Sequence, residues 1–539
     1  MKYTDFFRKI DDLNDLATEN RAARWLERAA FIFLTIMILF APHSIAVTQS
    51  AWLLGTLASV LRVIFKPRPK FRLRALHYAL GAFFLWSVVS SAFSYAPGVS
   101  LDKLRGVSLF LVFYFVYANL KTLRAARFLA FALIISATVA AAWMPIERIV
   151  GRGVEVHGLN AESPLLKARR IDEGLPISEG KTIVQVGRRK IYSPEGLVAE
   201  IEKRETSRLV VYHDDFYSTV EVNRTELLAG GTAAQRLGIA DWKRNHSWRA
   251  AGFYGHFTTF AEVLQLILSL AFGIFVSVLT ARLGKSKFEL SDFKSPIFIC
   301  LALAIALMAF ALLLTVTRAS QFAFFVSAAV IVLLGAPRRL ALTFAAIALP
   351  LAIVGLVYYQ QTRNIGFNLQ DKSTQYRTMM WRDGARLFGA NARNAVFGVG
   401  MDSIKLYWRE WDLFDRGREP MGHFHSTLVQ LAVERGLPAL LIWLTVLGIY
   451  ARTLRRHYKL QIANYKDKKE SGIRNPKSEI ERGIVLGCLG GLVGFFASGL
   501  VHYNLGDGEV ATVFYILMGL GFFICNFAKD VLPKTETAR

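Results

Sequence analysis

Residues 425–450 read HSTLVQLAVERGLPALLIWLTVLGIY, a polar segment of helix length followed directly by an apolar run. Gly436 and Pro438 separate the two parts, because glycine favours the end of a helix and proline the beginning of the next. Placing Gln430 and Glu434 in lipid without partners would cost several kcal/mol. We therefore expect the polar segment to form a short helix outside the bilayer core, where water or a polar substrate reaches it.

The composition indicates a polytopic membrane protein. Of 539 residues 53% are hydrophobic, and the apolar residues fall in unbroken runs. A net charge of +24 would suggest nucleic acid in a soluble chain. Here the basic residues cluster in short connections between apolar runs, so we expect contact with the lipid bilayer and no nucleic acid. The three cysteines lie in or at the ends of apolar runs and spell out no disulfide framework or metal-binding pair.

Apolar periodicity predicts the fold class: an all-α polytopic membrane protein with about 12 transmembrane helices of roughly 17 to 25 residues. One small α+β insertion interrupts the helices. The predicted span centres are Ile36, Leu57, Phe84, Phe113, Ala137, Leu268, Ala306, Val326, Ile347, Leu444, Val493 and Ile516.

Charges on alternate connections predict the orientation of these spans. The basic connection at 66–74 reads KPRPKFRLR, and further basic connections lie at 121–127, 338–339 and 452–469. Positively charged connections favour the cytoplasmic side, so both termini should be inside. Two long connections are then left on the opposite face.

We divide the chain accordingly. About five spans occupy residues 1–144, and an extracytoplasmic loop with the insertion occupies 145–250. About four spans follow in 251–359, then a large extracytoplasmic catalytic loop in 360–436, and about three spans in 437–539.

The insertion has its own pattern of strands and a helix. Within residues 181–222 the alternation predicts a strand at 183–186, a helix with Leu197, Val198 and Ile201 on one face, and a hairpin of strands. The stretch from 177 to 224 resembles the latter part of a PDZ domain. No clear glycine-rich carboxylate-binding loop precedes it, so a rigid spacer or lid is the alternative to binding an envelope protein partner.

His425 is the candidate reactive group of the polar segment. On a helix Thr427, Gln430 and Glu434 share one stripe, whereas His425 and Glu434 point to opposite sides. We therefore expect a structural or distant electrostatic role for Glu434. Imidazole can take up a proton near neutral pH, which suits His425 to proton transfer. The alternative is that His425 only caps an interfacial helix.

The spacing of the polar segment resembles the signature of the O-antigen ligase and polymerase superfamily. The matching positions are His425, Ser426, Gln430, Glu434 and Gly436. Three further stretches resemble family motifs in the right order: TVTRASQFAFF around Arg318; the loop segment from Gln375 to Ser403 with Arg377, Trp381, Gly398 and Gly400; and RAAGFYGHFTTFAEVL around Arg249, Gly252 and His256. The resemblance extends from about Trp25 to Phe527 and leaves out the PDZ-like insertion.

This resemblance implies an inverting glycosyltransferase of the bacterial inner membrane, with its active site facing the periplasm. Such enzymes move a glycan from a polyprenyl (undecaprenyl) diphosphate carrier to an acceptor hydroxyl without cofactor or metal. The acceptor would be lipid A core, as in an O-antigen ligase, or else a growing glycan or a protein. Arg318 and Arg377 would bind the leaving diphosphate, since guanidinium groups make paired hydrogen bonds to phosphate oxygens. His425 would act as general base for the acceptor hydroxyl.

Other polar residues are second-tier candidates. This group comprises Arg249, His256, Glu262, Arg382, Gln430 and Glu434. Arg382 belongs to a loop in which basic and acidic residues alternate, which favours a solvated mixed-charge face. The alternative for Arg318 and Arg377 is snorkelling, or pairing with an acid such as Asp371 or Asp383.

Two other classes of function stay open. About twelve spans also describe many secondary transporters or lipid flippases, but those have two related halves with polar residues at mid-depth, which this chain lacks. A scaffold that holds envelope enzymes through the PDZ-like insertion could coexist with catalysis.

Overall fold

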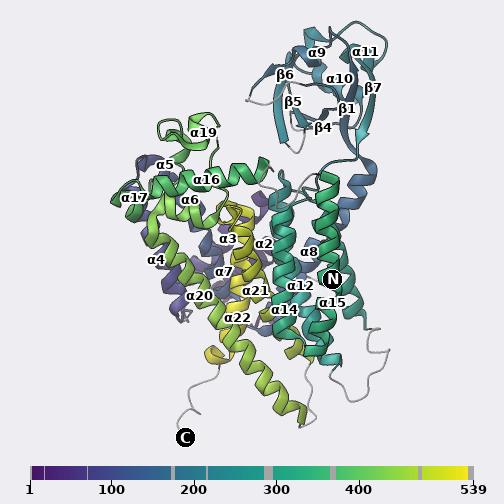
Figure 1. The fold of residues 1–539 in the computed structure, drawn as a ribbon. Helices are drawn as coiled ribbons and strands as arrows, with labels where there is room; N and C mark the ends of the chain where they lie inside the picture. Colours follow the sequence, from purple (N-terminus) through teal and green to yellow (C-terminus); the bar gives the residue numbers. More distant parts are fainter. Residues whose placement is uncertain are drawn as a thin grey trace. The chain divides into compact units, whose positions relative to one another are not determined.

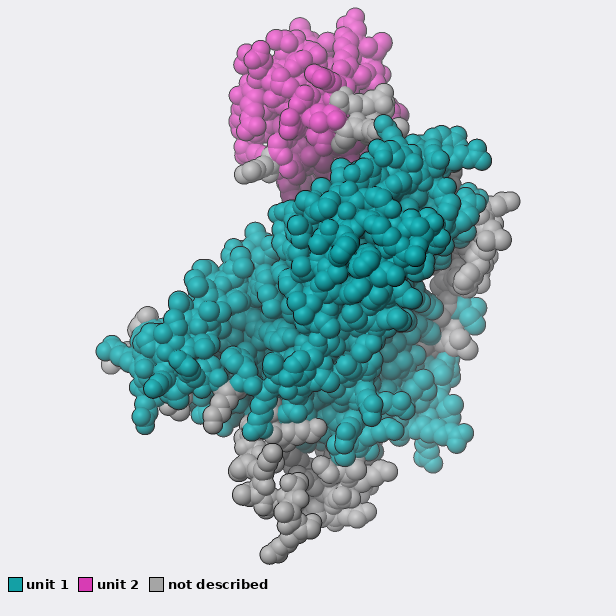
Figure 2. Space-filling view, turned by 90° about the vertical axis from the view of Figure 1, so that its left-hand side faces the viewer, with its two compact units in different colours: residues 1–140, 253–539 teal, residues 141–252 magenta. Residues whose placement is uncertain are grey.

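The computed structural model describes residues 3–16, 18–69, 71–171, 177–187, 189–213, 216–283, 295–363, 372–419, 421–470 and 476–531. The chain divides into two compact units, coloured separately in Figure 2. Unit 1 comprises Met1–Ala140 and Phe253–Arg539, and unit 2 comprises Ala141–Gly252.

Unit 1 is built from helices (Figure 1). In chain order they are α1 (Tyr3–Asn14), α2 (Arg21–Phe40), α3 (Ile45–Arg62), α4 (Ala75–Ala92), α5 (Pro97–Asp102), α6 (Leu104–Val107), η1 (Ser108–Phe110), α7 (Leu111–Asn119), α8 (Leu123–Val150, which continues into unit 2), α12 (Phe257–Leu283), α13 (Pro296–Leu314), α14 (Arg318–Gly335), α15 (Arg338–Arg363), α16 (Lys372–Gly389), α17 (Ala392–Phe397), α18 (Ile404–Tyr407), α19 (Leu413–Gly417), α20 (Thr427–Glu470), α21 (Pro476–Gly499), η4 (Asn504–Gly506) and α22 (Gly508–Val531).

In the described ranges, eight helices are long and apolar enough to cross a membrane: α4, α8, α12, α13, α14, α20, α21 and α22. The chain is thus a multi-pass helical membrane protein. All twelve predicted span centres fall in helices, but those in α2, α3, α7 and α15 are outside this set of eight. The count of twelve spans stays a prediction.

Local chemistry explains why two of these four helices, α2 and α7, are outside the set of eight. The first turns of α2 carry Arg24, Glu27 and Arg28, and Glu27 lies 2.7 Å from Arg62 Nε and 2.8 Å from Lys121 Nζ. Arg28 pairs with Asp11, so these first turns hold paired charges at one end of the bundle, where lipid would exclude them. The span predicted around Phe113 is divided, because the 3-10 turn η1 separates α6 from the short α7.

Close packing of α12, α14 and α21 fixes the centre of unit 1. A Cβ at Gly273 in α12 would lie 2.4 Å from the Cα of Gly487 in α21, so these backbones meet where neither residue has a side chain. In α14, Ser327 Oγ donates a hydrogen bond of 2.7 Å to the carbonyl of Gly490. Gly335 lies against Leu486. Helices α14 and α21 therefore run antiparallel.

A segment of short helices, α16 to α19, packs at the end of the bundle where α4 ends and α20 begins. The Val399 N–H donates to the carbonyl of Val433 at 2.8 Å, and the Gly400 N–H donates to the carbonyl of Glu434 at 2.9 Å. These bonds join the segment to the first turns of α20. Its core is formed by apolar residues such as Phe414 and Phe424.

The break predicted at Gly436 and Pro438 is present inside α20. Gly436 has a φ of +78°, outside the helical region, and the helix continues after it. A Cβ at Gly436 would lie 1.9 Å from the carbonyl oxygen of Val396. Both the backbone angle and the close approach require glycine here.

Unit 2 is a seven-stranded antiparallel sheet with short helices, and its strand order is β2-β6-β5-β3-β1-β7 with β4 paired to β3. The elements are β1 (Arg152–Leu159), α9 (Pro164–Lys167), β2 (Arg169–Arg170), β3 (Thr182–Val186), β4 (Arg189–Lys190), α10 (Pro194–Glu202), β5 (Thr206–His213), β6 (Phe216–Asn223), η2 (Arg224–Glu226), α11 (Ala233–Leu237) and β7 (Ile239–Asn245).

The predicted strand, helix and hairpin of the insertion correspond to β3, α10, β5 and β6. Leu197 and Ile201 of α10 pack into the core with Ile183 and Val211, as their spacing predicts. Two strands outside the predicted stretch, β1 and β7, complete the sheet. Whether this unit is a PDZ domain, and whether it is extracytoplasmic, stay predictions.

The Gly436→Ala variant should be destabilised by at least about 2 kcal/mol, because the positive φ alone costs about 1–3 kcal/mol and the methyl group would collide with backbone. The measurement is the melting temperature of the purified protein in detergent. Gly448→Ala in the same helix is the matched control, since a Cβ there meets no atom within 4 Å. Its melting temperature should stay the same or rise; an equal loss in both variants would contradict the role of Gly436.

Candidate active site

Three histidines form a cluster at the end of the bundle where α20 begins. The ring centroids of His423 and His425 are 4.1 Å apart, and those of His425 and His502 are 5.8 Å apart. His423 and His425 precede α20, whereas His502 lies in the turn between α21 and η4. The cluster is thus assembled from two segments that are distant in sequence.

The backbone around His425 is held by side chains from two helices. His425 has a φ of +47°, so it lies before the helix and not in its first turn. Gln430 Oε1 accepts a hydrogen bond of 2.8 Å from the Phe424 N–H. Trp381 Nε1 of α16 donates to the Phe424 carbonyl at 3.1 Å. These two bonds fix both backbone polar groups of Phe424, the residue before His425.

Thr427 fixes His502 in the same way. Its N–H donates to the His502 carbonyl at 3.0 Å, and its hydroxyl donates to Asn504 Oδ1 at 2.8 Å. Asn504 in turn donates to the Phe495 carbonyl at the end of α21, at 2.7 Å. The start of α20 and the end of α21 therefore share one hydrogen-bonded network, which sets the distance between the histidines.

A buried carboxylate faces His502. Glu262 of α12 is 2% exposed, and its Oε1 lies 3.2 Å from His502 Nδ1. Neither Glu262 oxygen makes a hydrogen bond in the described part of the chain, so the carboxyl group and the imidazole are in close contact without a hydrogen bond. One turn earlier, Thr259 donates to Asp507 Oδ2 at 2.6 Å. The second-tier candidate Glu262 thus joins the cluster through His502.

The surroundings lower the pKa of His423 and of His425. Burial lowers the pKa of His425 to about 3, and the nearby His423, His502, Arg377 and His256 add to the effect. Burial, followed by the charges of His502 and Lys405, lowers the pKa of His423 to about 4. Both imidazoles are therefore neutral near pH 7, and a neutral imidazole has one nitrogen that can accept a proton.

Of the two predicted arginines, Arg377 is close enough to act on the charge of His425. It lies one turn before Trp381 on α16, and residues four apart share a helix face. Trp381 is bonded to the residue next to His425, so this face of α16 is turned toward the cluster. Arg377 is partly buried.

Arg318 begins α14 and is exposed. Because α14 and α21 run antiparallel with Ser327 beside Gly490, the N-terminus of α14 is level with the C-terminal end of α21. That end leads into the turn with His502. Arg318 therefore lies at the same end of the bundle as His425; its direct contact with a substrate stays a prediction.

Gln430 and Glu434 are buried, contrary to the expectation that this segment is reached by water. Glu434 Oε1 accepts a hydrogen bond of 2.9 Å from the Asp402 N–H, while Gln430 binds the Phe424 N–H. The backbone N–H groups of Asp402 and Phe424 replace water here. That is why these polar side chains tolerate burial.

The remaining candidates lie in different surroundings. His256 is exposed just before α12 and near enough to lower the pKa of His425. Arg382 is exposed on α16. Arg249 belongs to unit 2, so its part in the site stays a prediction.

The two acids considered as partners of Arg318 and Arg377 are Asp383 and Asp371. Asp383 accepts a hydrogen bond of 2.8 Å from the Phe414 N–H and lies 3.8 Å from Arg386. Asp371 is outside the described residues.

Sequence reasoning missed His423 and His502. His423 stands two residues before His425, a spacing that suggests a shared location. His502 follows the span centred at Val493 on the same predicted face as His425, which was the available signal. In the described part of the chain, no group of three or more His, Cys, Asp or Glu is arranged to hold a metal ion.

Comparison with known proteins bears directly on this segment. Residues 303–444 match the family model for O-antigen ligase. The match contains Arg318, Arg377 and His425 and ends within α20. The family resemblance predicted from the motifs is therefore confirmed for this part of the chain. A search of curated proteins finds no match.

The neutral histidines predict acid sensitivity of this end of the bundle. The unfolded chain binds a proton at each histidine near the ordinary pKa of about 6.5, whereas in the folded chain His423 and His425 have pKa values of about 4 and about 3. Their contribution to stability is complete above the unfolded value and is lost as the pH falls from there toward the folded values.

A His423→Gln/His425→Gln double variant should therefore show a smaller fall in melting temperature than the wild type between about pH 7 and about pH 4. Carboxylates titrate in both proteins, so the difference isolates the two histidines. Parallel curves for the two proteins would contradict the burial of neutral imidazoles at this site.

Proposed function

We propose that this chain, whose residues 303–444 form an O-antigen ligase family domain, is an inverting glycosyltransferase that moves a glycan from a polyprenyl diphosphate to an acceptor hydroxyl. The observation that supports it is the grouping of neutral His425 with Arg377, His502 and Glu262 at one end of the membrane bundle. A proton acceptor and a cation for phosphate are what this displacement requires. On the predicted topology, this end faces the periplasm of the inner membrane.

The proposed displacement has a single step. The acceptor hydroxyl oxygen attacks the anomeric carbon while the bond from that carbon to the diphosphate oxygen breaks. The electron pair of the broken bond stays on the diphosphate, and the hydroxyl proton passes to the neutral imidazole of His425. Attack from the side opposite the leaving group inverts the configuration at the anomeric carbon.

The diphosphate also adjusts the basicity of His425. With a pKa of about 3 in the free protein, His425 is a weak base. Burial of the imidazole is the main cause, and the positive charges nearby add to it. A bound diphosphate brings negative charge beside Arg377 and His425, which offsets those cations and raises the pKa toward neutrality. Donor binding would thus prepare the base for the reaction.

Arginine suits the leaving-group role because its charge is permanent and its planar fork pairs with two phosphate oxygens. In this proposal Arg377 binds the diphosphate beside His425, and Arg318 approaches it from the start of α14. Glu262 lies in close contact with His502 and so keeps this third histidine directed at the cluster.

The acceptor that the protein uses distinguishes an O-antigen ligase from a polymerase or a protein O-oligosaccharyltransferase. Purified protein would be incubated with polyprenyl diphosphate glycan and, in separate reactions, with lipid A core, with a second glycan, or with a serine-containing protein. Product with lipid A core supports the O-antigen ligase activity that we favour. Elongated glycan would indicate a polymerase, and modified protein an O-oligosaccharyltransferase. Movement of the lipid-linked donor across the bilayer with no product would indicate a transporter or flippase.

The His425→Ala variant should lower the transfer rate by at least about 100-fold, because a positioned general base contributes on the order of 10²–10⁴. More of the labelled lipid-linked donor should remain, and correspondingly less labelled product should form, than with the wild type. His246→Ala, which removes an exposed histidine of unit 2, is the control and should keep the wild-type rate. Transfer at the normal rate by His425→Ala would overturn the assignment of His425.

The Arg377→Gln variant tests the diphosphate site. Loss of one group that stabilises developing negative charge costs on the order of 100-fold in rate. The matched control is Arg382→Gln, which removes an exposed arginine from the same helix and should change kcat/KM by less than about threefold. Equal effects in both variants would show that Arg377 acts only through the general positive charge of α16.

A further inference from the structure

A cavity of about 360 Å³ lies between α4, α20 and α22. Its lining combines two kinds of residue. Four are basic, namely Arg74, Arg452, Arg456 and His457, and most of the others are apolar, such as Ile449, Leu460 and Phe522. Among the described residues none of those lining it is acidic. This volume lies within the range of small-ligand sites.

Its place in the fold puts the cavity at the edge of the apolar layer. Arg74 immediately precedes the candidate span Ala75–Ala92, and Asn526 is the second-to-last residue of the span Gly508–Phe527. Helix α20 begins beside His425, and Arg452 lies in its second half, after most of the apolar span. The cavity therefore lies at the opposite end of the bundle from the histidines, the end that the basic connections predict to be cytoplasmic.

Two arginines of α20, Arg452 and Arg456, carry charge that is not used within the described part of unit 1. Arg452 and Arg456 are four residues apart and so share one face of α20. Within the described ranges, neither guanidinium makes a hydrogen bond or an ion pair. Two neutral polar groups of the lining already bond within their own helices, since Thr453 Oγ1 donates to the Ile449 carbonyl at 2.8 Å and Asn526 Nδ2 to the Phe522 carbonyl at 2.8 Å. The guanidinium groups of Arg452 and Arg456 are donors that remain available to a ligand.

We propose that this cavity binds the headgroup of an anionic phospholipid from the adjacent leaflet. The phosphate would accept hydrogen bonds from Arg452 and Arg456, and the acyl chains would lie along the apolar lining formed by Ile449, Leu460 and Phe522. A soluble phosphate would satisfy the arginines but leave that apolar lining uncovered. The combination of cations with apolar surface at the bilayer boundary favours a lipid.

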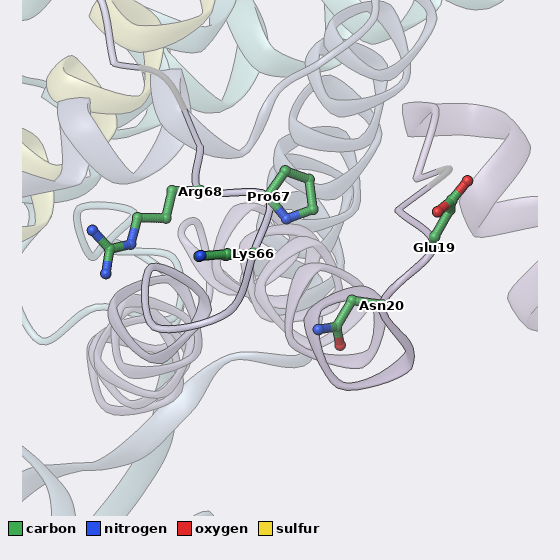
Figure 3. Close-up of a pocket in the computed structure, with 5 residues that line it drawn as sticks. All are labelled: Glu19, Asn20, Lys66, Pro67 and Arg68. Carbon is green, nitrogen blue, oxygen red and sulfur yellow. The ribbon is translucent and has the colours of Figure 1, made fainter.

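Another pocket, of about 740 Å³, lies on the α2 and α3 side of unit 1 and is suited less well to an anion (Figure 3). Its lining residues are Glu19, Asn20, Lys66, Pro67 and Arg68. The carboxylate of Glu19 opposes a negative ligand, and Figure 3 shows Glu19 directed away from Lys66 and Arg68. Its side chains do not converge on one point, and the lining lacks large apolar residues.

Lipid titration of the full-length protein in detergent, followed by native mass spectrometry, tests the proposal. The lipids are dioleoyl phosphatidylglycerol and, as a neutral comparison, dioleoyl phosphatidylcholine. The test variant is Arg452→Gln/Arg456→Gln. The matched control is Arg455→Gln/Lys459→Gln, which removes the same charge from exposed positions of the same helix that do not line the cavity.

We expect the wild type and the control to retain phosphatidylglycerol in preference to phosphatidylcholine, and the test variant to bind phosphatidylglycerol on the order of tenfold more weakly. Equal weakening in both double variants, or no preference for the anionic lipid, would overturn the proposal. Glycerol phosphate at millimolar concentration is a further arm. Complete displacement of the lipid by it would show that the site takes a free phosphate instead.

Unchanged melting temperatures in the two double variants would show that both are folded. Should the test variant fail to fold, Arg456→Gln alone removes one of the two donors. This single variant is then compared with Arg455→Gln in the same titration. Loss of affinity in the first and not in the second supports the site; identical affinities contradict it.

Discussion

The pairing of buried polar groups at the start of α20 is the constraint on which the candidate site depends. This helix begins where protein, bilayer and water meet, so its polar side chains must find partners within the chain. Gln430 binds the backbone before His425, and Glu434 binds the backbone of the short-helix segment. The same contacts therefore stabilise the fold and determine where His425 and α16 lie.

The site is assembled from the ends of helices rather than from one continuous motif. His425 precedes α20, His502 follows α21, Glu262 lies in the first turns of α12, and Arg377 lies on α16. Helix ends at the bilayer boundary can hold charged groups that the middle of a span would exclude. The tightly packed α12, α14 and α21 keep these ends in register, because their close backbones leave little room for relative movement.

Much of the helical architecture could be predicted from the sequence, because long apolar runs and the Gly436–Pro438 break are local signals. The hairpin of unit 2 could also be predicted, because the alternation of apolar and polar residues in its strands is a local signal. The burial of Gln430 and Glu434 could not be predicted, since their partners come from Phe424 and from the distant Asp402. His502 was missed for a related reason: the predicted topology places it only on the same face as His425, and its approach to that residue is set by packing of α21 against α20.

The kink at Gly436 divides α20 into two arms with different attachments. The first arm is tied by hydrogen bonds to the loop at Asp402 and to the turn at Asn504, and α16 bonds to Phe424 just before it. The second arm, from Pro438 onward, crosses the apolar layer. Helices adapt to bilayers of different thickness mainly by tilting. Because the first arm has its own attachments, a change in the tilt of the long arm would be taken up at Gly436 before it reached the candidate site, which would make the site less sensitive to lipid composition.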